Sequence, residues 1–341
     1  MRKDSIKSRN TFTEGEPIQE PRDFNTFNID YKKEDEKYKD LLIGICTKRL
    51  KDSLYPIANI EKYLVDNPNE FLDIEAKIKD EIDRLFFSSS NRKSEQPNQE
   101  FYTKYRITAI HRIYSSKNSK FPYCGFEQYK YLSFGIISNF LELCKHTFYF
   151  ALSKEKDLHL NPQINPLIQN HSVYYVSERL FNQIDGNVPE VGPILKVLLT
   201  KLGQLIRLKM LKHTTETECN RVSLINYDEH TFRYKLLPKV IKKANTWSVF
   251  DFNSSDEAMK TKNEFSPKTD EIIINRIYCP YLEISARSRW TIPINADDLD
   301  GLMGDKSSKF FKKISSEILP TTNISKKSID NELFDNGTDS N

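Results

Sequence analysis

Glycine is scarce in this chain, and the glycine-rich motifs that bind nucleotide phosphates are missing. Only 10 of the 341 residues are glycine. A P-loop needs the pattern G-x-x-x-x-G-K-[ST], because its backbone N–H groups and its lysine surround the phosphates. No glycine here is followed by lysine, and no two glycines have the required spacing. No G-x-G-x-x-G occurs either, so we expect no cofactor.

Cysteine and histidine are few and widely separated. The five cysteines form no C-x-x-C pair, and the six histidines have no metal-ligand spacing. The patterns H-E-x-x-H and G-x-S-x-G are also missing. These observations predict no metal site, no catalytic residues and no intrinsic enzyme activity. We expect free thiols in a reducing cytosol, and histidines at the surface or in helix caps.

Long hydrophobic runs are missing too. No run of about 18 apolar residues occurs, so no helix is predicted to span a membrane. The stretch Met1–Arg9 has no apolar segment of the kind found in signal peptides. We therefore expect a cytoplasmic protein without a membrane partner. The net charge of +3 and the pI of about 8.3 are only mildly basic. Binding of nucleic acid would have to rest on local patches.

The first half of the chain is predicted to be helical. Residues 1–37 are charged and lack apolar periodicity, so we expect a mostly irregular segment. Residues 38–155 are interpreted as one helical domain, with apolar residues recurring every three or four positions. Its predicted helices begin near residue 35, at Asn67, near residue 100 and at Ser133, where Asn67 and Ser133 act as caps.

Residues 165–300 are interpreted as a second domain, with a boundary near 155–165 where Pro162 and Pro166 interrupt the chain. Strand patterns appear only in its later part, so the predicted fold class is mainly α with a small β component. Residues 304–341 are expected to form a low-complexity tail with one short helix near 308–318. The predicted elements of the second domain are helices at 166–184, 191–212 and 236–247, and strands at 248–252, 271–277 and 283–294.

Two details of the second domain are specific enough to be checked. The apolar stripe of the 191–212 helix is so wide that the helix should be buried. Gly203 within that helix suggests that another part of the chain packs closely against it. Four aromatic residues on apolar stripes or strand faces are interpreted as core residues, not as platforms for base stacking: Tyr174, Tyr175, Trp247 and Trp290.

Several short hydrophobic signatures carry a resemblance to a known family. The block Leu132-Ser-Phe-Gly-Ile-Ile-Ser-Asn-Phe-Leu-Glu-Leu-Cys144 resembles the lid helix of bacterial origin-recognition-complex-like AAA+ ATPases. The segment from Tyr38 to Leu50 resembles the helix that enters that lid. Residues 192–203 and 274–292 look like the C-terminal winged helix of the same proteins. The resemblance covers about residues 24–300 and implies a helical AAA+ lid-like bundle followed by a winged-helix domain.

The resemblance also shows where this chain departs from the family. The lid of such ATPases carries the "sensor 2" arginine, which contacts the nucleotide phosphates. The matching position here is Ser138, and a serine supplies no cation. Together with the missing P-loop, this implies a lid without its nucleotide contact, preceded by no recognisable ATPase core.

Candidate nucleic-acid-binding residues lie in two places. Basic side chains gather on the 236–247 helix opposite its apolar stripe, and we expect no acid to interrupt them. Two arginines alternate with apolar residues in the predicted 283–294 strand, on the outer side of a predicted wing hairpin. Lysine and arginine at such positions meet DNA phosphates in helix-turn-helix proteins. The candidates are Arg233, Lys235, Lys239, Lys242, Lys243, Arg287 and Arg289.

Three functions remain open from the sequence. The first is a non-catalytic protein that binds double-stranded DNA or regulates a machine of replication, plasmid maintenance or phage defence. The second is an interaction module that docks on a separate ATPase core or effector subunit without touching nucleic acid. The third is a truncated ATPase remnant, active only if a separate chain supplies the P-loop core.

Overall fold

The computed structural model describes about two thirds of the chain. Our description covers residues 36–52, 57, 59–67, 72–89, 97–117, 119–154, 163–212, 218–227, 236–253 and 270–318. Within these ranges no helix is long and apolar enough to cross a membrane. All five cysteines are buried and free of disulfides. The predicted irregular segment 1–37 lies almost entirely outside this description, as do Pro162 and the tail beyond residue 318.

The first half contains a group of packed helices, namely α1 (Glu36–Asp52), α4 (Phe126–Ser133), α5 (Ile137–Lys154) and α6 (Pro166–Asn182). α5 packs against both α4 and α6. The short helix η2 (Ile60–Lys62) lies against α1. Tyr38 of α1 is fully buried, and its hydroxyl is 2.7 Å from the hydroxyl of Ser133 at the end of α4. This bond anchors α1 on the group.

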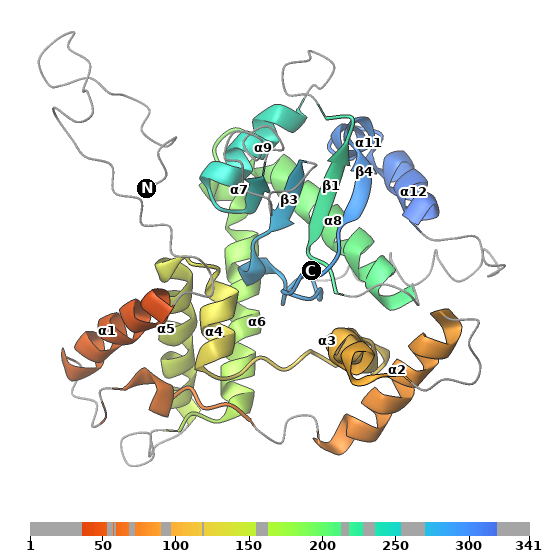
Figure 1. Cartoon of the computed structure of the whole chain (residues 1–341). Helices are drawn as coiled ribbons and strands as arrows, with labels where there is room; N and C mark the ends of the chain where they lie inside the picture. The colour runs from red at the N-terminus through yellow and green to blue at the C-terminus, as the bar shows by residue number, and fades with distance from the viewer. Residues whose placement is uncertain are drawn as a thin grey trace, which may run out of the picture.

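A helix pair lies apart from that group, as Figure 1 shows. It consists of α2 (Glu75–Ser89), which follows η3 (Leu72–Ile74), and α3 (Gln99–Ser116). α2 packs along α3, and α3 contacts α8 (Gly192–Lys212) of the second half. The Arg112 side chain of α3 donates a hydrogen bond of 2.9 Å to the carbonyl of Met210. Thr108 of α3 donates one of 3.0 Å to Glu218. The pair is therefore attached to the second half by buried polar contacts.

A four-stranded sheet organises the second half (Figure 1), in the order β2-β3-β1-β4. β1 is antiparallel to β3 and parallel to β4, and β2 is antiparallel to β3. The succession α8-β1-α9-β2-β3 is consistent with a winged-helix-like arrangement, to which β4 adds an edge strand. The strands are β1 (Arg221–Ile225), β2 (Phe250–Asn253), β3 (Glu271–Ile274) and β4 (Ile292–Asn295), and α9 spans Leu237–Thr246.

Short helices complete the second half. α7 (Ile184–Asn187) precedes α8 and packs against it, and η4 (Arg276–Tyr278) follows β3. α11 (Ala296–Gly301) follows β4, and α12 (Ser307–Ile318) packs against both α11 and α8. The predicted fold class, mainly α with a small β component, is confirmed.

The first half of the chain departs from the predictions at Ser133. Ser133 does not cap α5, because it is the last residue of α4, a helix that the sequence did not predict. Its hydroxyl donates to the carbonyl of Lys130 instead. Phe134 and Gly135 then take positive φ angles of 58° and 78°, which separate α4 from α5. The second predicted helix also starts later than Asn67, since α2 begins at Glu75.

The predicted strand 283–294 is wrong over most of its length. Only β4 forms there, and Glu283 has a φ of +52°, which an extended strand does not allow. Ile284, Ser285 and Ala286 are all buried, so the apparent alternation of inward and outward side chains does not exist. Arg287 and Arg289 therefore lie in a loop before β4. The antiparallel pair of neighbouring strands is β2 and β3 instead.

The prediction of a buried 191–212 helix is confirmed by α8, whose leucines at 195, 198, 199 and 202 are fully buried. At Gly203 another part of the chain comes very close to the backbone of α8. A Cβ atom at this position would lie 2.9 Å from Cδ2 of Leu282. The loop after η4, and not another helix, is therefore what packs against Gly203.

The two halves are joined through α6. This helix was assigned to the second domain, yet it packs along α5 and also contacts η4 beyond β3. Tyr281, just after η4, donates its backbone N–H to the Ser177 hydroxyl of α6 at 3.0 Å. The domain boundary near 155–165 stays a prediction.

Asp300 of α11 caps α9 from a distance, and its removal should destabilise the protein. Its Oδ1 accepts the backbone N–H groups of Leu236 and Leu237 at 3.0 and 2.8 Å. These donors open α9 and have no side-chain cap of their own. We expect Asp300→Ala to lower the free energy of unfolding by about 1 kcal/mol, the usual value of a helix cap. Urea denaturation measures this change. The exposed Asp305→Ala is the matched control, and equal stability of both variants would contradict the capping role.

Candidate nucleic-acid interface

The outer face of α9 carries three of the predicted basic residues. Lys239 and Lys242 are exposed and Lys243 is half-buried, while Leu237, Val240, Ile241 and Ala244 face the core. The apolar stripe and the opposite lysine face are therefore as predicted. Arg233 and Lys235 lie outside the described residues.

An acid from outside the helix interrupts this lysine face. Glu190, in the turn between α7 and α8, pairs with Lys243 at 2.7 Å and with Lys239 at 2.9 Å. Hydrogen bonds from Lys243 and then Lys239 lower the pKa of Glu190 to about 2. The expectation that no acid interrupts the face was wrong, because the sequence of α9 alone cannot reveal a neighbour from another turn. Among the described residues, Lys242 makes no ion pair.

Arg287 and Arg289 line a cleft at one end of the sheet, together with two arginines that the sequence did not single out. Arg221 opens β1, and Arg276 lies in η4, directly after β3. The strand register explains why these four arginines lie close together. Arg221 pairs with Ile273 near the end of β3, and β4 starts beside Val222. We call this hollow the arginine cleft. Among the described residues that line it, none is acidic.

Side chains around the cleft fix the positions of these arginines. Arg221 donates from Nε to the Ser288 hydroxyl at 2.6 Å and from an Nη to the Ser288 carbonyl at 3.0 Å. Another Nη of Arg221 lies 3.4 Å from the nearly buried carboxylate of Glu271. Arg289 Nε lies 3.4 Å from the buried carboxylate of Glu218. The carboxylates stand behind the arginines, so the open side of the cleft stays cationic.

Aromatic rings from the first half form the opposite wall of the arginine cleft. The guanidinium of Arg276 lies 3.7 Å from the centre of the Tyr131 ring and 4.9 Å from that of Phe134. Such stacking is favourable and holds the guanidinium plane in place. Tyr131 lies in the last turn of α4, and Phe134 is the left-handed residue that directly follows this helix. The cleft is thus built from both halves of the chain.

The predicted core aromatic residues divide into two groups. Tyr174 is buried, as expected, and Trp290 packs partly buried against the core, with Lys209 Nζ 3.7 Å from its ring. Trp247 and Tyr175 are 47% and 40% exposed, so their assignment to the core was wrong. Trp247 directly follows α9, in the turn before β2.

The other candidate positions give no binding site. Ser138, at the sensor 2 position, is exposed in the first turn of α5. Within the described residues no group of three or more histidine, cysteine, aspartate or glutamate side chains could hold a metal ion.

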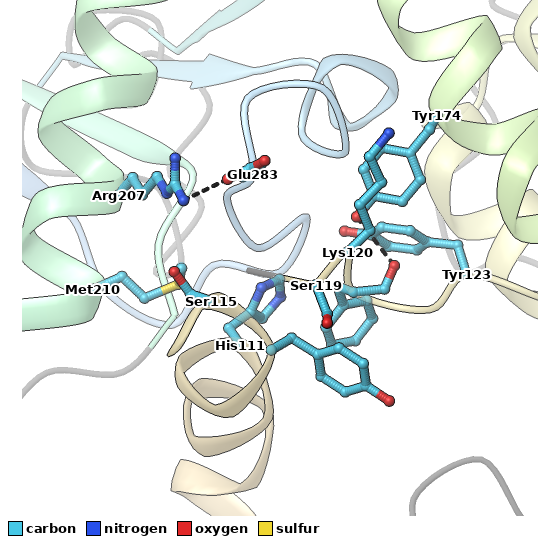
Figure 2. A pocket seen from close by; sticks show the side chains of 11 residues that line it. His111, Ser115, Ser119, Lys120, Tyr123, Tyr174, Arg207, Met210 and Glu283 are labelled. Carbon is cyan, nitrogen blue, oxygen red and sulfur yellow. Dashed lines mark hydrogen bonds and ion pairs between the residues drawn. The ribbon is translucent and has the colours of Figure 1, made fainter. Parts of the chain in front are cut away.

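A small cavity lies between α3, α6 and α8 (Figure 2), and its volume is about 20 Å³. That volume suits about one water molecule and excludes an organic ligand. Figure 2 shows Arg207 of α8 and Glu283 facing each other near His111 of α3. His111 is buried and stacked on Phe121 with ring centres 4.2 Å apart, which corrects its expected surface location. Burial lowers the pKa of His111 to about 3.

Comparison with known proteins assigns the chain to a family. The model of the family described as ORC-CDC6-like matches residues 1–82 and 59–294. No curated protein and no solved structure shows significant similarity to the chain. The family match includes both walls of the arginine cleft and the whole of α9. The chain therefore belongs to the ORC-CDC6-like family and is related to AAA+ ATPases.

Proposed function

We propose that this protein binds double-stranded DNA by its phosphate backbone, without catalysing a reaction on it. The observation that carries the proposal is the arginine cleft, where the exposed Arg287 and Arg289 lie on the rim of a hollow that Arg221 and Arg276 also line. Arginine binds phosphate through paired N–H donors in a fixed plane, which suits it for this role better than lysine. The winged-helix order of the second half supports the same proposal, since that element positions helices on DNA in many proteins.

The face of α9 is a second, weaker contact in this proposal. Lys242 is available to a phosphate, whereas Lys239 and Lys243 share Glu190. Exposed ion pairs of this kind contribute little stability, so a phosphate can displace Glu190 at small cost. The rim of the cleft and α9 together give four or five cations, namely Arg287, Arg289 and two or three lysines.

A regulatory role fits this DNA-binding proposal. The missing P-loop and Ser138 at the sensor 2 position support a protein that does not hydrolyse nucleotide by itself. Such a protein would act on DNA in replication, plasmid maintenance or phage defence. An upstream gene encoding a P-loop AAA+ core would instead favour an ATPase assembled from two chains.

Fluorescence anisotropy with a labelled duplex of about 20 base pairs tests the proposal. We expect a dissociation constant in the micromolar range or tighter at about 50 mM salt, and clearly weaker binding at about 200 mM, because phosphate contacts release counterions. No binding at the lower salt concentration would refute it.

Two variants test whether the lysine face of α9 contacts DNA, and they should change the DNA affinity in opposite directions. Glu190→Gln releases Lys239 and Lys243, so DNA affinity should rise about threefold, which is a small electrostatic gain for exposed groups. Lys242→Glu should lower the affinity about tenfold by placing a negative charge near phosphate. Lys79→Glu on α2 makes the same charge change on a distant exposed surface and is the control. If both α9 variants bind like the control, α9 faces away from DNA.

A second candidate function has its own observation. An exposed aromatic surface runs along α5 and α6, where Tyr149 is 66% exposed and Tyr175 is 40% exposed. Phe150 lies between them, with ring centres 5.4 and 5.2 Å away. Exposed clustered aromatic side chains are typical of protein interfaces. This surface favours docking on a separate AAA+ core subunit.

Where an upstream gene encodes a P-loop AAA+ core, co-purification of this protein with the product of that gene tests the second function. Tyr149→Ser combined with Tyr175→Ser should abolish a complex formed through the aromatic surface. An unchanged complex would exclude this surface as the docking site.

A further inference from the structure

The arginine cleft is a hollow with the volume of a small-ligand site. It measures about 480 Å³, within the range of about 300–1,000 Å³ that is usual for such sites. Its lining comes from the turn after α4, from β1 and β3, from η4 and from the loop before β4. A duplex is a wide convex cylinder, so its backbone phosphates can reach the rim but not the interior of such a hollow.

The four arginines occupy different places with respect to that opening. Arg287 and Arg289 are both exposed; no ion pair with a described residue holds Arg287, whereas Arg289 pairs with Glu218. Arg221 is more enclosed, with 31% of its side chain exposed, and is fixed by Ser288 and Glu271. Arg276 is half-buried and stacked on Tyr131. A backbone phosphate on the rim can meet Arg287, whereas Arg221 and Arg276 need a group that enters.

The interior offers more donors than a backbone phosphate can use. A phosphodiester carries one negative charge, whereas a phosphate monoester carries close to two at neutral pH and has three acceptor oxygens. Several fixed guanidinium groups converging on one hollow match the second group better. Because Glu271 and Glu218 hold Arg221 and Arg289 in advance, little side-chain entropy is lost when the ligand binds. The rings of Tyr131 and Phe134 give a nucleoside an apolar wall next to the phosphate.

We propose that the arginine cleft recognises a phosphate monoester attached to a nucleoside, either at the end of a DNA strand or in a free mononucleotide. This inference rests on the DNA-binding function of the same cleft, but it is separable from that function. Binding along the duplex needs only the rim, whereas recognition of a terminal phosphate needs Arg221 and Arg276 inside.

Three duplexes of one sequence test the proposal, carrying phosphate on the 5′ ends, on the 3′ ends, or on neither. We expect one phosphorylated form to bind about tenfold more tightly than the unphosphorylated duplex, as a charge-assisted contact would give. Equal affinity of all three would overturn this inference while leaving DNA binding intact. Binding of none of them would overturn both.

Competition with mononucleotides separates the two sources of the monoester. If a nucleoside monophosphate displaces the phosphorylated duplex while the same nucleoside does not, the cleft accepts free nucleotides as well. Displacement only by phosphorylated strands would assign the site to strand ends. Displacement by neither would overturn the proposal.

Variants connect the preference to the cleft. Arg276→Gln should remove the preference for the phosphorylated duplex and leave binding of the unphosphorylated duplex within about twofold, because Arg276 lies inside the cleft. Arg276→Lys should restore part of the preference by returning the charge. Arg221→Gln is a second variant should Arg276→Gln fail to fold, with circular dichroism as the check. A preference that survives both glutamine variants would overturn the proposal, and Lys79→Glu again serves as the control.

Discussion

Arg287→Glu combined with Arg289→Gln is expected to lower the affinity for duplex DNA about 100-fold at about 50 mM salt, since each arginine contact is worth about 1–3 kcal/mol. Both residues lie in the loop before β4, on the open side of the arginine cleft. Glutamine is chosen at position 289 because Arg289 Nε lies 3.4 Å from the buried Glu218 carboxylate. A glutamate there would repel Glu218, and lost binding could then reflect a damaged fold.

The control separates lost contacts from a general change of charge. Lys79→Glu on α2 reverses a charge on an exposed position away from the cleft, and should change the affinity by less than about twofold. The circular dichroism spectra of the variants should match that of the wild type. An affinity within threefold of the wild type in the double variant would mean that the arginine cleft does not contact DNA.

The second large effect is a loss of stability in mild acid caused by His111. Its pKa is about 3 in the folded protein, and about 6.5 in an unfolded chain. Between these values the unfolded state binds more protons, so stability is fully present above about pH 6.5 and is lost as the pH falls towards 3. From pH 7 to pH 5, the difference amounts to about 2 kcal/mol of unfolding free energy from this one residue.

Urea denaturation at pH 7 and pH 5 measures that loss, and His111→Phe is the comparison. The variant keeps a flat ring next to Phe121 and has no proton to bind, so its stability should fall by about 2 kcal/mol less between the two pH values. Any cost of the substitution that does not depend on pH cancels in this difference. Lys120, Arg207 and Glu283 also line the cavity near His111. Equal pH dependence of both proteins would show that His111 is accessible to protons.

The sequence predicted helices where apolar spacing is regular. α8 and α9 have wide or sharply divided apolar faces, and their bounds agree with the prediction within about one residue. β1 was missed because its polar residues Arg221 and Ser223 interrupt a short apolar run, and its burial comes from lying between β3 and β4. The false strand at 283–291 has the opposite cause, since its alternation in sequence does not survive the turn at Glu283.

The candidate interface was predicted only in part, because its residues are far apart in the chain. Arg287 and Arg289 stood out as a pair, whereas Arg221 and Arg276 join them only when β1 and β3 pair. Glu190 reaches the lysine face of α9 from a turn about fifty residues earlier, and no local pattern reveals such a contact. The spacing of residues along one helix predicts which side chains share a face. Which other parts of the chain contact that face is decided by the tertiary fold.

The salt dependence of DNA affinity tests the arginine cleft most directly, when the wild type is compared with Arg287→Glu/Arg289→Gln. The logarithm of the association constant should fall linearly with the logarithm of the salt concentration, with a slope of about −0.9 for each phosphate contact. Four or more contacts predict a slope of about −4 or steeper for the wild type, and a slope flatter by about 2 for the variant. Parallel lines for the two proteins, whatever their absolute affinities, would contradict the assignment of the cleft as the phosphate-binding site.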